Sequence, residues 1–186
     1  MFDAPRDKPA LIMGGSGDVV THGELESRYR RLAQLLHARG LRPGDHLAVL
    51  LENEPAYYEV FWAAQRSGLY LTPVNWHLRA DEAGYIVEDC GASAVVVSAS
   101  LVSLSDGLAP YLDSVTTRLV VGADPAGTEL ARPDLAGWEP YEDAVVGQPD
   151  EPLDEELEGA WMFYSSGTTG RPKGIKAPYA KMQQPV

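Results

Sequence analysis

Residues 164–174 hold the side chains of this sequence that are best suited to bind an anion. The stretch reads YSSGTTGRPKG and contains two Ser, two Thr, three Gly, one Arg and one Lys. Glycine lets backbone N–H groups approach a ligand, Ser and Thr hydroxyls can donate to phosphate oxygens, and Lys supplies a positive charge. The apolar residues 161–164 lead into it and predict a buried strand. The first hypothesis is therefore a nucleotide-phosphate loop.

Two common phosphate-binding patterns do not describe this loop or the other glycine-rich stretch. A Walker A loop needs Ser or Thr directly after its Lys, whereas Lys173 is followed by Gly174. The glycines of residues 14–17 do not complete a dinucleotide GxGxxG pattern, because Val20 stands at the third glycine position. These glycines predict the turn of a small hairpin over residues 10–20 instead.

Composition favours a globular acidic protein. The 186 residues are 45% hydrophobic, which is enough for one domain with a buried core. The net charge is −12, whereas nucleic-acid binding requires a basic surface. No apolar run approaches the ~18 residues that span a bilayer. With no signal-peptide pattern and a single cysteine, the sequence predicts a cytoplasmic protein that has no internal disulfide.

Other residues that could do chemistry have simpler interpretations. The acidic residues 150–158 predict a solvated linker or helix end, since no His or Cys lies among them to favour the alternative of a metal site. Cys90 lacks an evident His partner and is expected to be a small packed residue. No GxSxG pattern occurs. The histidines show no metal-ligand spacing and predict surface or capping roles: His22, His37, His46 and His77.

The elements that must position the loop follow an alternating pattern. Helices are predicted from the caps Thr21 and Asn53, over 81–90 and over 100–112. An aromatic stripe at 57–62 is expected to pack in the core. Strands are predicted at 46–51, 69–74, 93–98, 117–122 and 160–164.

This alternation predicts an α/β fold, a mostly parallel sheet with helices on both faces in three layers. Residues 1–122 form repeated βα units, and residues 123–159 an irregular acidic connection with one short helix near 141–146. Residues 160–186 hold the core strand, the phosphate loop and the end of the chain. Residues 75–78 follow a strand at the edge where such folds bind ligands.

The string YSSGTTGRPKG resembles the signature phosphate loop of the adenylate-forming (AMP-binding) enzymes: acyl-CoA synthetases, aryl-CoA ligases, luciferases and peptide-synthetase adenylation domains. The resemblance extends over nearly the whole chain and is weakest in residues 100–159. The phrase VNWHL followed by DEAGYIVEDCGA is most like bacterial fatty-acyl-CoA synthetases. The fold expected is the N-terminal part of the adenylate-forming fold.

The resemblance implies a two-step reaction and a role for each matched residue. A carboxylic acid, a fatty acid by the closest likeness, would react with Mg²⁺·ATP to give an acyl-adenylate, and coenzyme A would then displace AMP. Lys173 would neutralise phosphate charge, and no metal ligand is assigned in this chain. The residues that would wrap the ATP phosphates are Ser165, Ser166, Gly167, Thr168, Thr169 and Gly170.

The resemblance also implies that further motifs of such enzymes have no counterpart in these residues. The adenine- and Mg²⁺-binding motifs, the acyl pocket and a C-terminal catalytic Lys are among them. The chain is thus expected to be an N-terminal portion that is inactive alone and associates with itself through uncovered apolar surface. Two alternatives are a non-catalytic nucleotide-binding module and a fragment of a peptide-synthetase adenylation domain, whose acceptor is a carrier protein.

Overall fold

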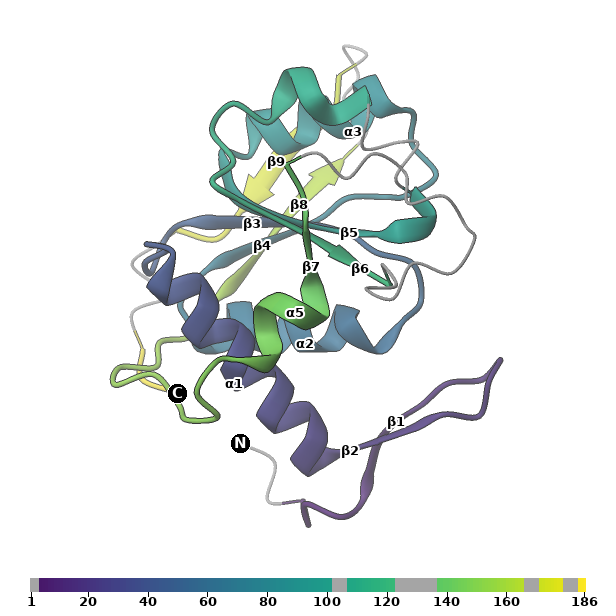
Figure 1. Cartoon of the computed structure of the whole chain (residues 1–186). Coiled ribbons are helices and arrows are strands. Elements are labelled where there is room, and N and C mark those ends of the chain that lie inside the picture. Colours follow the sequence, from purple (N-terminus) through teal and green to yellow (C-terminus); the bar gives the residue numbers. More distant parts are fainter. Residues whose placement is uncertain (1–3, 102–106, 123–136, 166–170, 179–183) are drawn as a thin grey trace.

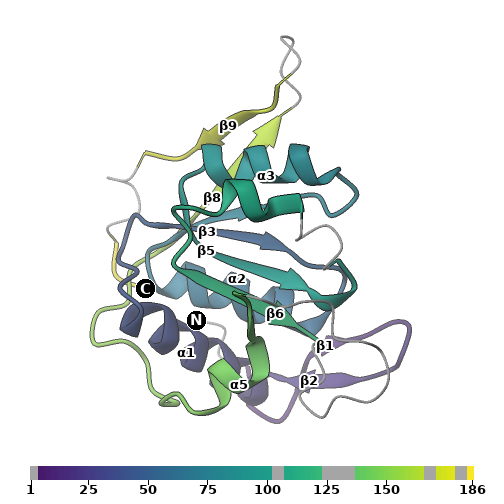
Figure 2. The same ribbon diagram turned by 45° about the horizontal axis from the view of Figure 1, so that its top comes forward.

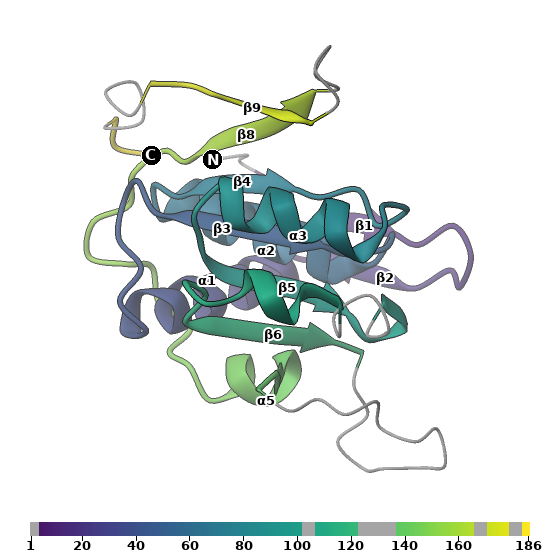
Figure 3. The same ribbon diagram turned by 90° about the horizontal axis from the view of Figure 1, so that it is seen from above.

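A seven-stranded sheet forms the centre of the molecule. The computed structural model describes residues 4–101, 107–122, 137–165, 171–178 and 184–186. The strand order is β7-β6-β5-β3-β4-β8-β9, and only the β8–β9 pair is antiparallel (Figure 3). The strands are β3 (His46–Leu50), β4 (Tyr70–Pro73), β5 (Ala92–Ser98), β6 (Thr117–Val121), β7 (Glu139–Pro140), β8 (Ala160–Ser165) and β9 (Lys173–Lys176). The predicted, mostly parallel sheet is confirmed.

Helices cover both faces of this sheet, so the predicted three layers are also confirmed (Figure 1). One face carries α1 (His22–Ala38), α2 (Pro55–Arg66) and α5 (Tyr141–Val146). The opposite face carries α3 (Ala80–Asp89) and a 3₁₀ turn at Ala109–Tyr111. Each face has its own cluster of buried apolar side chains. Among the described residues, no helix is long and apolar enough to cross a membrane.

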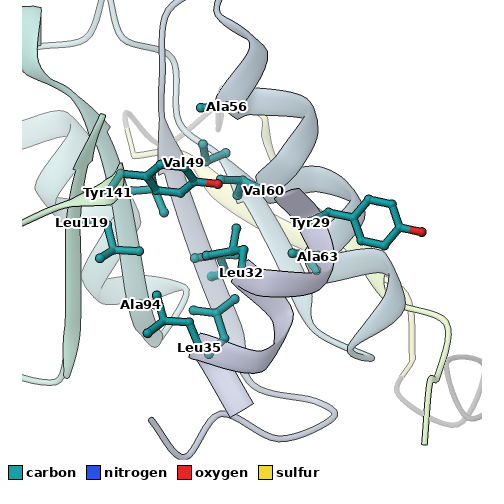
Figure 4. Close-up of a cluster of buried hydrophobic side chains, with 14 of the residues drawn as sticks. Tyr29, Leu32, Leu35, Val49, Ala56, Val60, Ala63, Ala94, Leu119 and Tyr141 are labelled. Carbon is teal, nitrogen blue, oxygen red and sulfur yellow. The ribbon is translucent and has the colours of Figure 1, made fainter. Parts of the chain in front are cut away.

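Helix α1 begins at the predicted capping box. The Thr21 hydroxyl accepts a hydrogen bond from the Glu24 N–H, and the Glu24 carboxylate accepts one from the Thr21 N–H. The helix buries one apolar face, and its side chains Leu32 and Leu35 lie in the cluster between the helix and the sheet (Figure 4). Before it, the predicted hairpin forms from β1 (Pro9–Ile12) and β2 (Val19–Thr21) and stands apart from the main sheet (Figure 2).

A buried charged network joins the three helices of this face. Glu59 of α2 is 6% exposed and accepts hydrogen bonds from Arg28 Nε at 3.0 Å and the Tyr141 hydroxyl at 2.8 Å. Arg28 also forms a bidentate pair with Glu142, both contacts at 2.7 Å. Because each buried polar group has a partner, the network avoids the cost of an unpaired carboxylate.

The start and the aromatic side of α2 differ from expectation. Its N-cap is Glu54, which makes no side-chain cap, and Pro55 is the first helical residue, so Asn53 is not the cap. The buried face carries small residues such as Ala56, Val60 and Ala63, which allow close helix packing. The aromatic side chains Tyr57, Phe61 and Trp62 are half-buried and pack against the edge of this core, in part as predicted, whereas Tyr58 is 47% exposed. Tyr58, Phe61 and Trp62 line an open apolar pocket of about 580 Å³ between α1, α2 and β1.

Two other predictions are confirmed only in part. Of the helix predicted over 100–112, residues 102–106 lie outside the described residues, residues 107–108 are helical, and 3₁₀ turns form at Ala99–Leu101 and Ala109–Tyr111. In the irregular connection, residues 123–136 lie outside the described residues and α5 forms where a short helix was predicted.

Strand β8 is less buried than its sequence predicts. Its pairing with β4 ends at Trp161, although β4 continues to Pro73, and residues 162–165 pair with β9. Met162 faces the buried cluster beneath α3 and is 7% exposed, whereas Phe163 points to the other face and is 51% exposed. An apolar run predicts the strand correctly but does not show that one of its faces stays open.

Candidate functional site

The two ends of the predicted phosphate loop meet across the β8–β9 ribbon. Ser165, the last residue of β8, pairs in register with Lys173, the first residue of β9, and both are exposed. Residues 171–172 belong to the described part of the connection. The other predicted loop residues lie outside the described residues: Ser166, Gly167, Thr168, Thr169 and Gly170.

Strand alternation gives the two faces of this ribbon different roles. Tyr164 and Gly174 form the register pair next to Ser165 and Lys173, so the two pairs point to opposite faces. A Cβ on Gly174 would lie 2.3 Å from Met162 Cε and 3.1 Å from the Tyr164 ring. Glycine at this position thus lets β9 lie close to β8 beside the loop.

Helix α3 contacts the loop at both ends. The Tyr164 hydroxyl donates to Asp89 Oδ2 at 2.7 Å. The Tyr85 hydroxyl lies 3.2 Å from Asp89 Oδ1 and 3.4 Å from the carbonyl oxygen of Pro172, either of which can accept its single proton. The Arg171 guanidinium lies over the Tyr85 ring, 5.2 Å from its centroid. Burial and the hydrogen bond to Asp89 raise the pKa of Tyr164 above its ordinary value.

Sequence reasoning missed Tyr85 and Asp89. Their spacing of four residues places them on one face of α3, which is a signal that they act together. Nothing in the sequence connects that face to residues 164–172, because the contact depends on β8 joining the sheet next to β4. The structure therefore adds two residues to the surroundings of the loop.

The far end of β9 is held by a second cluster. Lys176 Nζ lies 3.0 Å from His46 Nε2 and 4.7 Å from the centroid of the Tyr70 ring. Tyr70 stacks on His46 and donates its hydroxyl proton to the carbonyl of Ala177 at 2.5 Å. Burial, together with the charge of Lys176, lowers the pKa of His46 to about 4. His46 is 8% exposed, so its predicted surface or capping role is wrong.

The carboxyl edge of the parallel strands carries further polar groups. The Ser98 hydroxyl donates to Glu54 and accepts a hydrogen bond from the Glu52 N–H at 2.9 Å. Burial raises the pKa of Glu54. After β4, the His77 N–H donates to Asn75 Oδ1 at 3.0 Å, which orders the predicted loop at this edge. Edges of this kind are where α/β sheets bind ligands.

The other sequence candidates have structural roles. Cys90 is 5% exposed, its S–H contacts the Val87 carbonyl at 3.3 Å, and burial raises its pKa to about 11. It is a packed residue, as predicted. In the acidic stretch, Glu156 pairs with Arg66 of α2, and Asp150 accepts from Ser27 of α1 at 2.8 Å. Within the described part of the chain, no three His, Cys, Asp or Glu residues form a group that could hold a metal ion.

Comparisons with known proteins agree with the fold and identify the family. The family model for AMP-binding enzymes matches residues 2–184. A feruloyl-CoA synthase of an Amycolatopsis species is 37% identical over 93% of this chain. A fatty acid–[acyl-carrier-protein] ligase of Streptomyces coeruleorubidus is 32% identical over 90% of it. The chain spans 31% and 29% of the lengths of these two relatives.

Solved structures show the same fold. An anthranilate CoA ligase in complex with anthranoyl-AMP superposes with a TM-score of 0.76 at 23% identity, covering 94% of this chain and 32% of that one. The N-terminal domain of FACL13 from Mycobacterium tuberculosis gives 0.67 at 22% identity, covering 88% and 38%. At these identities the likeness concerns the fold alone. The family match, which spans nearly all of the sequence, shows that this chain belongs to the AMP-binding enzymes.

Proposed function

We propose that residues 1–186 supply the phosphate loop of an ATP-dependent acid–thiol ligase. In the first step, a carboxylate oxygen attacks the α-phosphorus of ATP, the bond to the bridging oxygen breaks, and pyrophosphate leaves. In the second step, a thiol attacks the acyl carbonyl, loses its proton and displaces AMP. The proposal concerns a protein of the relatives' length, since this chain spans about three tenths of theirs.

One observation carries the proposal: the ribbon presents Ser165 and Lys173 side by side on an exposed face at the two ends of the SSGTTGRPKG string. Strand β8 is parallel to β4, so its carboxyl end points to the edge of the sheet where ligands bind. The opposite face of the ribbon is held by α3. The same face also exposes Phe163 and Ile175, so it is polar only at its end beside the loop, where Ser165 and Lys173 could meet a polyphosphate ligand.

The proposed roles follow from charge. Negative charge accumulates on the leaving pyrophosphate as the bond to the α-phosphorus breaks. Ser165, Ser166, Gly167, Thr168, Thr169 and Gly170 would donate hydrogen bonds to the β- and γ-phosphates. Lys173 would place its ammonium against them. Donors and charges that are fixed before the reaction stabilise such a transition state most strongly. Mg²⁺ would enter with ATP as part of the substrate.

For the acid and the acceptor, we propose a fatty acid and coenzyme A. The sequence of residues 74–92 supports the fatty acid. The relatives provide the competing choices, since one is named for ferulic acid and another for fatty acids and a carrier protein. Every combination of acid and acceptor uses the same adenylation step. The choice of acid affects only the acyl pocket, and the choice of acceptor affects only the second step.

ATP–pyrophosphate exchange tests the adenylation step. The protein expressed from the complete reading frame is incubated with ATP, labelled pyrophosphate and each acid of a panel of fatty acids and hydroxylated aromatic acids. We expect exchange that depends on a fatty acid, followed by thioester formation with coenzyme A. If only aromatic acids support exchange, an aromatic acid replaces the fatty acid in the proposal. If none of the acids supports exchange, the proposed function is overturned.

We further propose that residues 1–186 alone do not catalyse the adenylation of an acid. The same assay on this chain should give no exchange. Titration calorimetry with ATP should show binding no tighter than millimolar, because a phosphate loop alone provides few contacts. Submicromolar binding would favour the non-catalytic nucleotide-binding module.

A further inference from the structure

One turn of α3 contacts strand β8 before the phosphate loop and Pro172 just before strand β9. Asp89 accepts the hydroxyl proton of Tyr164 at 2.7 Å, one residue before the loop. Tyr85, one turn earlier, lies 3.4 Å from the carbonyl oxygen of Pro172, one residue before Lys173. The two α3 side chains also lie 3.2 Å apart, so they form one hydrogen-bonded unit. The unit touches the chain on each side of residues 165–171.

A carboxylate is electrostatically unfavourable at the position of Asp89 on α3. Asp89 is the last residue of α3, where the partial negative charge of the helix terminus repels a carboxylate. Asp89 and its neighbour Glu88 are both exposed at this helix end, where a carboxylate could face solvent alone. Asp89 instead directs its two oxygens to two tyrosine hydroxyls. The Tyr164 contact, at 2.7 Å, has the length of a charge-assisted hydrogen bond, which is directional and fixes the group that donates it, whereas the Tyr85 contact is longer at 3.2 Å.

The fixed group determines where the loop ends point. Tyr164 is turned toward α3, so the alternation of β8 turns Ser165 to the opposite face, and the register pair carries Lys173 with it. Gly174 adds no side chain between Tyr164 and β9. At the loop end of the ribbon, the contact between Tyr164 and Asp89 therefore holds the orientation of Ser165 and Lys173, whereas the far end is held by Lys176 and its partners.

We propose that Asp89 and Tyr85 are positioning residues that hold Ser165 and Lys173 in the orientation needed to bind the phosphates of ATP. The inference rests on the proposed function, since it assigns a role in the adenylation step. Neither residue is required to touch ATP. They act through Tyr164 and Pro172, and a displacement of about 1 Å at a catalytic group can cost on the order of 100-fold in rate.

The test compares the two half-reactions in the complete protein. Asp89→Ala should lower acid-dependent ATP–pyrophosphate exchange about 10-fold or more, mainly through kcat. Asp89→Asn keeps an acceptor for the Tyr164 hydroxyl and should recover most of the activity. Thiolysis of supplied acyl-adenylate involves no pyrophosphate, so its rate should stay within about 2-fold in every variant. Glu88→Ala is the matched control on the same helix end and should leave both half-reactions unchanged.

A double-mutant cycle tests the path through Tyr164. Tyr164→Phe removes only the hydroxyl and should reproduce the loss seen in Asp89→Ala, and the double variant should be no worse than either single variant. Equal losses in both half-reactions, or additive losses, would show a general structural role and overturn the inference. If the unmodified protein is active and the variants exchange at the same rate, the inference is overturned but the proposed function is not. Absence of exchange in the unmodified protein would overturn it together with the proposed function.

Discussion

Lys176 of β9 places its ammonium 3.0 Å from Nε2 of His46, the first residue of β3, at the edge of the sheet that lies opposite the phosphate loop. The Tyr70 ring stacks on the imidazole with centroids 4.7 Å apart, and it also lies beneath the ammonium. The imidazole is 8% exposed and next to a cation, which leaves it neutral at pH 7, and Nε2 can accept a hydrogen bond from the Lys176 ammonium.

The stability of the fold should therefore depend on pH through His46. Its pKa is lowered to about 4 in the folded chain, against 6.5 for the free side chain, because of burial and the charge of Lys176, with Asp45 opposing. Between these values the unfolded chain binds more protons, so the free energy of unfolding should fall as the pH decreases from 6.5 toward 4. Urea denaturation at steps of pH should show a shallower fall for His46→Gln than for the unmodified chain. The same pH slope in both would contradict this.

Removing the hydroxyl of Tyr141 should destabilise the chain by about 1.5–3 kcal/mol, the range for hydrogen bonds to charged groups. Tyr141 is fully buried and donates to Glu59 at 2.8 Å, and Glu59 is a carboxylate whose pKa is raised by burial. In Tyr141→Phe, the Glu59 carboxylate would keep only the hydrogen bond that Arg28 donates. Tyr58→Phe, at a side chain that is 47% exposed, is the control and should change the free energy of unfolding by less than about 0.5 kcal/mol.

A methyl group at Gly159 should disrupt the entry into β8. A Cβ there would lie 2.4 Å from the Ala64 carbonyl oxygen and 2.7 Å from that of Leu69. These are backbone atoms and cannot rotate away, so Gly159→Ala should cost about 1–3 kcal/mol or more. Gly147→Ala is the matched control, because a Cβ at Gly147 would have nothing within 4 Å. Equal unfolding midpoints in chemical denaturation for the two variants would be inconsistent with this packing.

The single thiol should be inert in the folded chain. Cys90 is 5% exposed and its pKa is raised to about 11, so at pH 8 both access and thiolate content are low. Its reaction with a chromogenic disulfide should be at least about 100-fold slower than in denaturant. A native rate close to that of the unfolded chain would show that the end of α3 opens readily.

Lys173 provides the direct test of the proposed site. In the complete protein, Lys173→Ala should lower adenylation about 10–100-fold through loss of a charged hydrogen bond of about 1.5–3 kcal/mol. Pyrophosphate exchange measures this. Lys8→Ala removes an exposed Lys from the β1 hairpin and should have no effect. If both variants exchange at the unmodified rate, Lys173 does not bind phosphate.

Local patterns predicted the elements well, because short-range physics decides them. The cap at Thr21 is an example, because the structure shows its reciprocal hydrogen bonds with Glu24. Periodicity was less informative about α2, where the residues expected in the core lie at its flank. An apolar stripe does not show which edge of a helix meets the sheet when small residues lie beside large ones.

The surroundings of the loop were the least predictable part. Motif chemistry pointed to Ser165 and Lys173 as candidates, and the structure pairs them across the antiparallel strands β8 and β9. The role of Asp89 depends on a strand about 70 residues later in the chain joining the sheet beside β4. That adjacency is a property of strand order, which no local pattern contains.

The sequence Lys-Gly-Ile-Lys of β9 has a further consequence, for aggregation. Its outer edge pairs with no other strand among the described residues, and all four of its residues are exposed. If two copies met edge to edge in antiparallel register, Lys173 of each would face Lys176 of the other, and like charges directly opposite each other are unfavourable. The two lysines thus disfavour aggregation through pairing of this open strand edge with another copy. The expected self-association stays a prediction, and this edge is its least favourable route.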